Sequence, residues 1–255
     1  MRKGRRNLLV LGGVVGTVYG LRALRWDRFF GDELTYVAIE GLPPFRSLAS
    51  GGPVSAGSDA LIGLDLPDAG AAARRARAEA VRADLCGPLF GADVPADTVS
   101  IAYFSEFRCP YCRTLERDLD DILATHPKSL RLVQHELPIF GPPSELAARA
   151  SVAAALQGLQ QPLRRRLMRT SLVADEQSVL AVAATVGLDT PQLARDMNSA
   201  GVQAEIDKTR ALADVLGFIG TPGLVIGRTV MMGAVPASLL RRVIADEQTM
   251  GPVAC

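Results

Sequence analysis

Short apolar runs and helical stripes alternate along the chain from residue 98 onward. Thr98–Phe104 (TVSIAYF) and Leu130–Glu136 (LRLVQHE) are compact, mainly apolar runs, which predict two buried strands. Between them the apolar positions are spaced by three and four residues, as on one face of an α-helix. These positions are Cys112, Leu115, Leu119 and Ile122. The region therefore begins as β-α-β.

Helical patterns then fill residues 144–216. Ser144 is expected to cap an Ala-rich helix (SELAARASVAAALQGL), and the later helices are expected at residues 162–170, 175–186, 191–198 (with Thr190 as cap) and 200–216. Leu224–Ile226 and Val230–Met232 predict two short strands, and Pro236–Gln248 predicts a final helix. The order β-α-β, helical block, β-β-α predicts an α/β fold with helices covering a mixed sheet.

The N-terminus has a different pattern, a basic segment followed by an uncharged one. Met1–Arg6 carries four positive side chains, and Asn7–Leu21 carries none. As a helix, the second segment would span roughly 22 Å, short of the ~30 Å hydrocarbon core. This favours an export signal over a buried core helix. Because three arginines and Trp26 follow without a small-residue cleavage site, we expect an uncleaved signal-anchor over residues 1–30. The rest of the chain would then lie in an oxidising compartment.

Residues 31–90 are expected to be a linker followed by a helix. Gly and Pro recur up to residue 70, with one short strand near Thr35–Ile39. Ala71–Leu85 predicts a helix ending at Cys86-Gly87-Pro88. Residues 91–255 would form the main domain. Lys and Arg total 28 against 27 Asp and Glu, so charge gives no reason to expect nucleic acid as a partner.

Two of the four cysteines stand three positions apart in F-R-C-P-Y-C-R, directly after the first strand. Cys109 would lead the helix and meet solvent, with Pro110 at the first helical position, whereas Cys112 lies on the core-facing stripe. Zinc sites use the same spacing. The remaining candidate ligands are scattered: Cys86, His126, His135 and Cys255. The pattern therefore favours a redox pair over a metal site, and the histidines are interpreted as ordinary packed or surface residues.

Redox exchange requires the attacking sulfur to be a thiolate. A helix N-terminus supplies partial positive charge there, and Arg108 and Arg113 add to it while Glu106 opposes it. The pKa of Cys109 is therefore expected to be lowered. Cys109 would form a mixed disulfide with a partner, which Cys112 would resolve. The sulfurs are the only redox centre needed, so no bound cofactor is expected.

Three motifs in order carry a family resemblance: F-R-C-P-Y-C-R, H-E-L-P-I-F-G-P-P-S-E-L-A-A-R-A and G-F-I-G-T-P-G-L-V-I-G. With them the chain resembles the DsbA-like thiol:disulfide oxidoreductases over about residues 98–248. The resemblance implies a thioredoxin-like fold with an all-helical insertion at about residues 144–216. It also implies that Cys109 is the nucleophile, that Cys112 is the resolving thiol, and that Thr221-Pro222 is the cis-proline loop that pairs with substrate backbone.

Two positions depart from the family pattern. Tyr111 stands between the cysteines where the best-known oxidases carry His, and a neutral phenol cannot supply a cation for the thiolate. Tyr103 stands six residues before Cys109, where thioredoxin-like families often place a buried carboxylate. Pro110 and Tyr111 are therefore expected to tune the redox pair.

The two other cysteines raise a separate question. In an oxidising compartment leftover cysteines tend to pair, so a structural disulfide between Cys86 and Cys255 is one hypothesis. Two unpaired thiols are the alternative.

Together these features predict an exported thiol:disulfide oxidoreductase of the bacterial periplasm, tethered to the inner membrane by its N-terminal segment. Its partners would be exported client proteins and a membrane redox protein that resets Cys109 and Cys112. Disulfide introduction is the expected direction. The alternatives are a reductase or isomerase that uses the same pair, a copper-handling protein with two soft thiolate ligands, and a non-catalytic binding module.

Overall fold

The computed structural model describes residues 34–49, 71–91, 94–95, 97–170 and 174–253. Every helix and strand described below belongs to the unit Tyr36–Cys255. The signal-anchor expected at residues 1–30 lies outside the described residues. Within the described part of the chain, no helix combines the length and apolarity needed to cross a membrane.

A six-stranded mixed sheet with the order β1-β2-β6-β5-β3-β4 forms the centre of this unit. β3 (Val99–Ser105) and β4 (Leu130–Glu136) are parallel, and β5 (Gly223–Ile226) and β6 (Thr229–Met232) form an antiparallel hairpin whose first strand pairs with β3. All seven side chains of β3 are buried, as the apolar run predicted.

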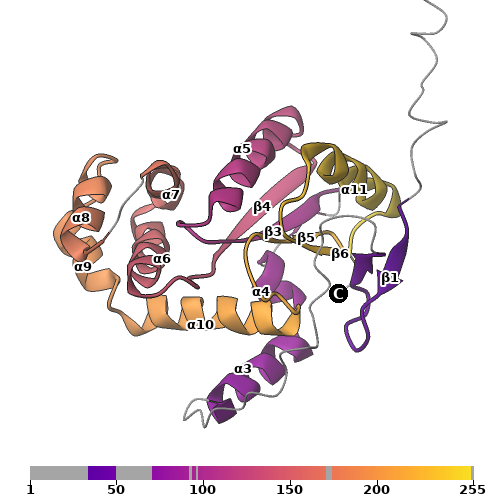
Figure 1. Ribbon diagram of the computed structural model, residues 1–255, viewed down its shortest axis with the longest axis horizontal. Coiled ribbons are helices and arrows are strands. Elements are labelled where there is room, and N and C mark those ends of the chain that lie inside the picture. Colours follow the sequence, from indigo (N-terminus) through magenta and orange to yellow (C-terminus); the bar gives the residue numbers. More distant parts are fainter. Residues whose placement is uncertain (1–33, 50–70, 92–93, 96, 171–173, 254–255) are drawn as a thin grey trace, which may run out of the picture. The chain divides into compact units, whose positions relative to one another are not determined.

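Helices cover the sheet, and Figure 1 shows α5 (Pro110–Thr125) and α11 (Ala237–Met250) side by side above it. The helical block lies between β4 and β5 in the sequence. It comprises α6 (Pro142–Ala154), a 3-10 turn at Ala155–Gln157, α7 (Gln160–Arg169), α8 (Glu176–Ala184), α9 (Thr190–Asp196) and α10 (Ala200–Val215). The predicted thioredoxin-like α/β fold with an all-helical insertion is confirmed.

The structure corrects the interpretation of residues 31–90 as a linker and a helix outside the main domain. β1 (Tyr36–Ala38) and β2 (Arg46–Leu48) extend the sheet, with β2 parallel to β6. After α3 (Ala71–Ala83), the residues expected to end that helix instead begin α4 (Cys86–Phe90), whose Leu89 and Phe90 enter the core. β1 lies within the short strand expected near Thr35–Ile39. β2 was not predicted, because a three-residue strand is too short to show an alternating pattern.

Two predicted helix caps are also wrong. α6 begins at Pro142 after Gly141, which has φ of +81°, and Ser144 lies inside the helix. α9 is capped by Asp189, whose carboxylate accepts a hydrogen bond from the Gln192 amide, and Thr190 is the first helical residue. Helix α6 starts after a glycine that offers no side-chain acceptor, and at α9 the preceding Asp189 is as good a cap as Thr190.

Candidate active site

The two active-site thiols lie at the start of α5, just after the loop that follows β3. Cys109 is the N-cap residue of α5, with extended φ and ψ of −78° and 117°, and Pro110 occupies the first turn. The Cys112 amide donates a hydrogen bond to Cys109 Sγ at 3.3 Å. A sulfur thus takes the acceptor role that a Ser or Asp oxygen fills at most helix starts. Along α5 both cysteines lie at the predicted positions, Cys109 at the helix start and Cys112 on the buried face.

The loop before β5 approaches the same sulfur from more than a hundred residues away in sequence. The Thr221–Pro222 peptide bond is cis, as the resemblance implied. The carbonyl oxygen of Thr221 lies 3.5 Å from Cys109 Sγ. The register that pairs Phe104 with Gly223 explains this proximity, because it sets the start of β5 beside the end of β3.

Both cysteines are free thiols, and both are more enclosed than the sequence suggested. Cys112 is fully buried, as predicted, whereas Cys109, which was expected to meet solvent, is only 3% exposed. The Thr221 loop accounts for the difference, since it lies against the sulfur. Tyr111 between the two cysteines is instead 61% exposed.

The pKa values of the two thiols are shifted in opposite directions. The pKa of Cys109 is lowered to about 6, chiefly because the Cys112 thiol donates a hydrogen bond to the thiolate, and the Cys112 amide adds to this against the opposing effect of burial. Burial raises the pKa of Cys112 strongly, and its interaction with Cys109 raises it further. At neutral pH, Cys109 is therefore the more readily ionised thiol, and Cys112 holds its proton. The predicted direction for Cys109 agrees with this.

Tyr103 is fully buried beneath the pair. Its hydroxyl donates a 2.8 Å hydrogen bond to the carbonyl oxygen of Cys112. Burial raises the pKa of Tyr103, so the hydroxyl keeps its proton and cannot serve as the base that a carboxylate would be at this position. It fixes the first turn of α5 instead.

Comparison with known proteins agrees with this geometry. Residues 100–245 match the model of the DSBA-like thioredoxin domain. The chain belongs to this family. A thioredoxin-like oxidoreductase from Silicibacter pomeroyi is 37% identical, with a TM-score of 0.59 over 64% of this chain and 97% of that one.

Other relatives are more distant. The thiol-disulfide exchange protein α-DsbA2 from Wolbachia pipientis is 18% identical, with a TM-score of 0.58 over 69% of this chain and 97% of that one, and supports the fold. A curated relative, the Na⁺/H⁺ antiporter NhaA from Herminiimonas arsenicoxydans, is 27% identical over 146 residues. These are 57% of this chain, which spans only 23% of the antiporter's length.

Glu106 has a structural role in this DsbA-like site that sequence reasoning missed. Its carboxylate is 1% exposed and accepts hydrogen bonds from the amides of Arg108 at 2.8 Å and Ile139 at 3.0 Å. It therefore joins the loop before Cys109 to the segment after β4. Its isolated position in the sequence gave no sign that it would be buried.

A second missed feature is a buried ionic cluster beneath the active site. Arg164 of α7 is fully buried and contacts Glu136 of β4 at 2.5 Å and Glu116 of α5 at 3.0 Å. It also donates to Ser105 Oγ at 2.7 Å. The cluster fastens the helical insertion to the thioredoxin-like sheet.

Exposed apolar side chains occur on the segments that converge on Cys109. Tyr111 lies in the active-site turn, Ile139 and Phe140 follow β4, and Ile219 precedes the Thr221 loop. Apolar side chains with 42% to 71% exposure on converging loops are suited to contact a polypeptide partner.

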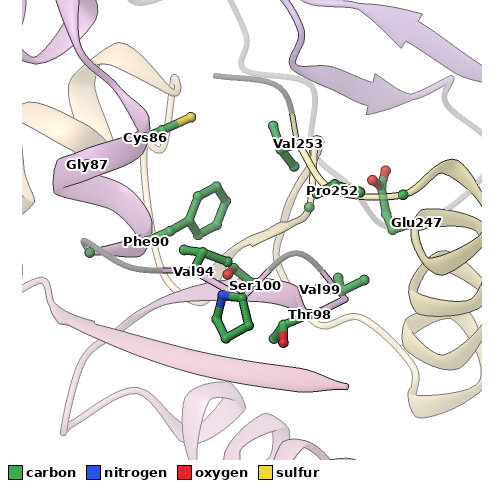
Figure 2. Close-up of a pocket in the computed structure, with 14 residues that line it drawn as sticks. Cys86, Gly87, Phe90, Val94, Thr98, Val99, Ser100, Glu247, Pro252 and Val253 are labelled. Carbon is green, nitrogen blue, oxygen red and sulfur yellow. The ribbon is translucent and has the colours of Figure 1, made fainter. Parts of the chain in front are cut away.

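The predicted Cys86–Cys255 pair can be followed only at one end. Cys86 is disulfide-bonded, and Cys255 lies outside the described residues. A cavity of about 220 Å³ at the far end of β3 is lined by Cys86 and also by Pro252 and Val253 (Figure 2). Arg228 holds this tail by donating to the Gly251 carbonyl at 2.6 Å. Pro252 and Val253 therefore lie near Cys86. The pairing of Cys86 with Cys255 stays a prediction.

The two histidines are structural in different ways. His135 is buried, stacks on Phe104 with ring centroids 4.6 Å apart, and shares a 2.9 Å hydrogen bond with the carbonyl of Leu89. Burial lowers its pKa to about 4, so it is neutral at physiological pH. His126 ends α5, with Nδ1 3.0 Å from the Ile122 carbonyl.

Proposed function

We propose that this DsbA-like protein introduces disulfides into exported client proteins, with Cys109 as nucleophile and Cys112 as resolving thiol. The observation that supports the proposal is that the pKa of Cys109 is lowered while that of Cys112 is raised. A stabilised Cys109 thiolate favours the reduced form of the pair, and this makes the corresponding disulfide an oxidant.

The reaction begins from the Cys109–Cys112 disulfide. A client thiolate attacks Cys109 Sγ, the bond between the two cysteines breaks, and Cys112 leaves with the electron pair and takes up a proton, as its raised pKa favours. A second client thiolate then attacks the client sulfur of the mixed disulfide. The client disulfide forms, and Cys109 leaves as the thiolate that its surroundings stabilise. Two electrons pass from client to protein.

The client would bind across the converging loops. Pro222 in the cis loop and the exposed apolar side chains around Cys109 would hold an extended client segment, while Pro110 and Tyr111 shape the turn. A membrane redox protein would return the pair to the disulfide. The bacterial periplasm is the proposed compartment, supported by a periplasmic thioredoxin-like protein of similar fold from Salmonella enterica, and the N-terminal segment is proposed as the inner-membrane tether.

The test is the redox equilibrium of Cys109 and Cys112 against glutathione in the purified chain. A potential near the ~−120 mV of a strong oxidase supports disulfide introduction, and one near the ~−270 mV of thioredoxin shows a reductase instead. Cys112→Ser should trap mixed disulfides on Cys109, and Cys109→Ser should trap none. If the unaltered protein, with Cys109 and Cys112 both present, catalysed no thiol–disulfide exchange, the proposal would be overturned altogether.

A further inference from the structure

A cavity of about 280 Å³ lies between α5 and α7, beginning one residue beyond Cys112. Four arginines line it, and they come from both helices: Arg113, Arg117, Arg165 and Arg169. The spacing of four residues within each pair puts both members on one helix face. Two rows of cations therefore face each other across the cavity, which we call the arginine groove.

The cations of the arginine groove outnumber the acidic side chains beside them. Among the described residues, none of the four takes part in an ion pair within 4.0 Å. Arg117 donates only to Thr114 Oγ1 at 3.4 Å. The carboxylates in the lining are Glu116 and Asp120, and Glu116 is already bound to the buried Arg164. Positive charge thus remains in excess.

The groove is joined to the active site by Arg113. Its guanidinium donates to the carbonyl of Phe107 at 3.0 Å, in the loop that precedes Cys109, and to the carbonyl of Thr170 at 3.2 Å, at the end of α7. A polypeptide that reacts at Cys109 and continues past the first turn of α5 would reach the groove within a few residues, because an extended chain covers about 3.3 Å per residue.

Ordinary helix electrostatics explains only part of this arrangement. Basic side chains favour the last turn of a helix, and Arg166 and Arg169 occupy that turn of α7. This does not account for Arg113 and Arg117, which lie in the first half of α5, where the helix dipole disfavours cations. Convergence of like charges costs free energy unless an anion offsets it.

We propose that the arginine groove binds an acidic segment of the client next to its reactive cysteine. The inference rests on the proposed function, because it assigns the client class that the Cys109 site would select. Carboxylates fit a row of guanidinium groups well, since each can accept two parallel hydrogen bonds. Clients with Asp or Glu within a few residues of the reacting thiol would be oxidised fastest.

The test compares two synthetic dithiol peptides that differ only in four flanking residues, Asp/Glu in one and Ser/Asn in the other. We expect kcat/KM to be at least several-fold higher for the acidic peptide at low salt, and the ratio to fall towards one near 1 M salt, where the Debye length is ~3 Å. Arg165→Gln/Arg169→Gln should bring the ratio close to one at low salt as well.

The matched control is Arg166→Gln/Arg241→Gln, which removes the same charge from exposed positions outside the groove. It should keep the preference for the acidic peptide. An equal loss in both double variants would mean that overall charge steers the peptides, and this would overturn the groove. An acidic-to-neutral ratio of one in the unaltered protein would overturn it too.

Failure of the inference can be told from failure of the proposed function. If the neutral peptide is oxidised but the acidic one gains nothing, only the arginine groove is wrong. If neither is oxidised, the proposed function fails, and the groove is then tested by the fluorescence anisotropy of a labelled acidic peptide whose cysteines are replaced by Ser. Binding that weakens in Arg165→Gln/Arg169→Gln, and not in the control, would support it, and binding that is absent or unaffected would overturn it.

Discussion

At the scale of single residues, the protonation of one sulfur decides how the pair reacts. The Cys109 pKa is lowered to about 6 because the Cys112 thiol and the amides of the first turn of α5 all donate to one sulfur. At pH 7 this stabilises the reduced pair by an amount on the order of 1 kcal/mol, or a few tens of millivolts for two electrons. The gap between thioredoxin and a strong oxidase is ~150 mV. Stabilisation of the Cys109 thiolate therefore makes the disulfide more oxidising, but it accounts for only part of this difference in redox potential.

Alkylation of the reduced protein tests this acidity directly. The rate at Cys109 should rise with a midpoint near pH 6 and level off above about pH 7, because only the thiolate reacts, while Cys112 stays unmodified. Peptide mass spectrometry after timed iodoacetamide pulses measures both sites. Cys112→Ala removes the largest cause of the lowered Cys109 pKa. The midpoint of Cys109 alkylation in this variant should therefore move towards the ordinary value of about 8.5. A midpoint near 8.5 in the unaltered protein would contradict the assignment.

At the scale of helices and strands, one buried arginine connects four of these elements by hydrogen bonds. Arg164 links α7 to α5, β4 and β3 through two carboxylates and the Ser105 hydroxyl. The carboxylates also affect each other, since burial raises the pKa of Glu116 and Glu136 adds to the rise. This cluster replaces what would otherwise be apolar packing between the insertion and the sheet.

Arg164→Met should therefore destabilise the fold by about 3–5 kcal/mol, because it leaves two buried carboxylates unpaired. Urea unfolding followed by circular dichroism measures the loss. Combining it with Glu116→Gln and Glu136→Gln should restore part of the stability, since no charge is then left buried. The exposed Arg166→Gln on the same helix is the control and should change the free energy of unfolding by less than about 0.5 kcal/mol.

The same cluster shows where prediction from sequence ends. Periodicity located β3, α5, β4 and the helices of the insertion, because long buried elements repeat their apolar positions. The C-P-Y-C motif located both thiols. Arg164 reads as one of three consecutive arginines on a polar helix, and its burial depends on carboxylates 28 and 48 residues away. The three-residue strand β2 is likewise set by pairing with β6 and by Arg46, which binds Glu247 at 2.8 Å.

At the scale of the whole molecule, the proposed Cys86–Cys255 disulfide would close nearly the full length of the domain. Pro252 and Val253 line the same cavity as Cys86, which favours this pairing (Figure 2). We expect non-reduced peptide mapping to yield one linked fragment that contains both cysteines. Cys86→Ala/Cys255→Ala should lower the free energy of unfolding by about 2–4 kcal/mol, as is typical for long loops. Separate, alkylatable Cys86 and Cys255 peptides would contradict the pairing.

The redox state of the active site should also change the stability of the whole fold, and pH should control the change. The folded pKa of Cys109 is depressed, so its contribution to the reduced protein is fully present above the unfolded value of about 8.5 and is lost as pH falls through about 6. The folded pKa of Cys112 is raised, so stability is lost again as pH rises beyond about 8.5, where the unfolded thiol ionises and the folded one does not.

The stability of the reduced form relative to the oxidised form should therefore rise from pH 6, peak near pH 8.5 and fall above it. Urea unfolding of both forms between pH 5 and 10 measures the difference, in a Cys86→Ala/Cys255→Ala background so that reductant acts on the active-site pair alone. Cys109→Ser/Cys112→Ser should give one curve that does not respond to reductant. A reduced-minus-oxidised difference that stays flat from pH 5 to 8 would show that the Cys109 thiolate is not stabilised by folding, and the link between this fold and an oxidising disulfide would then be lost.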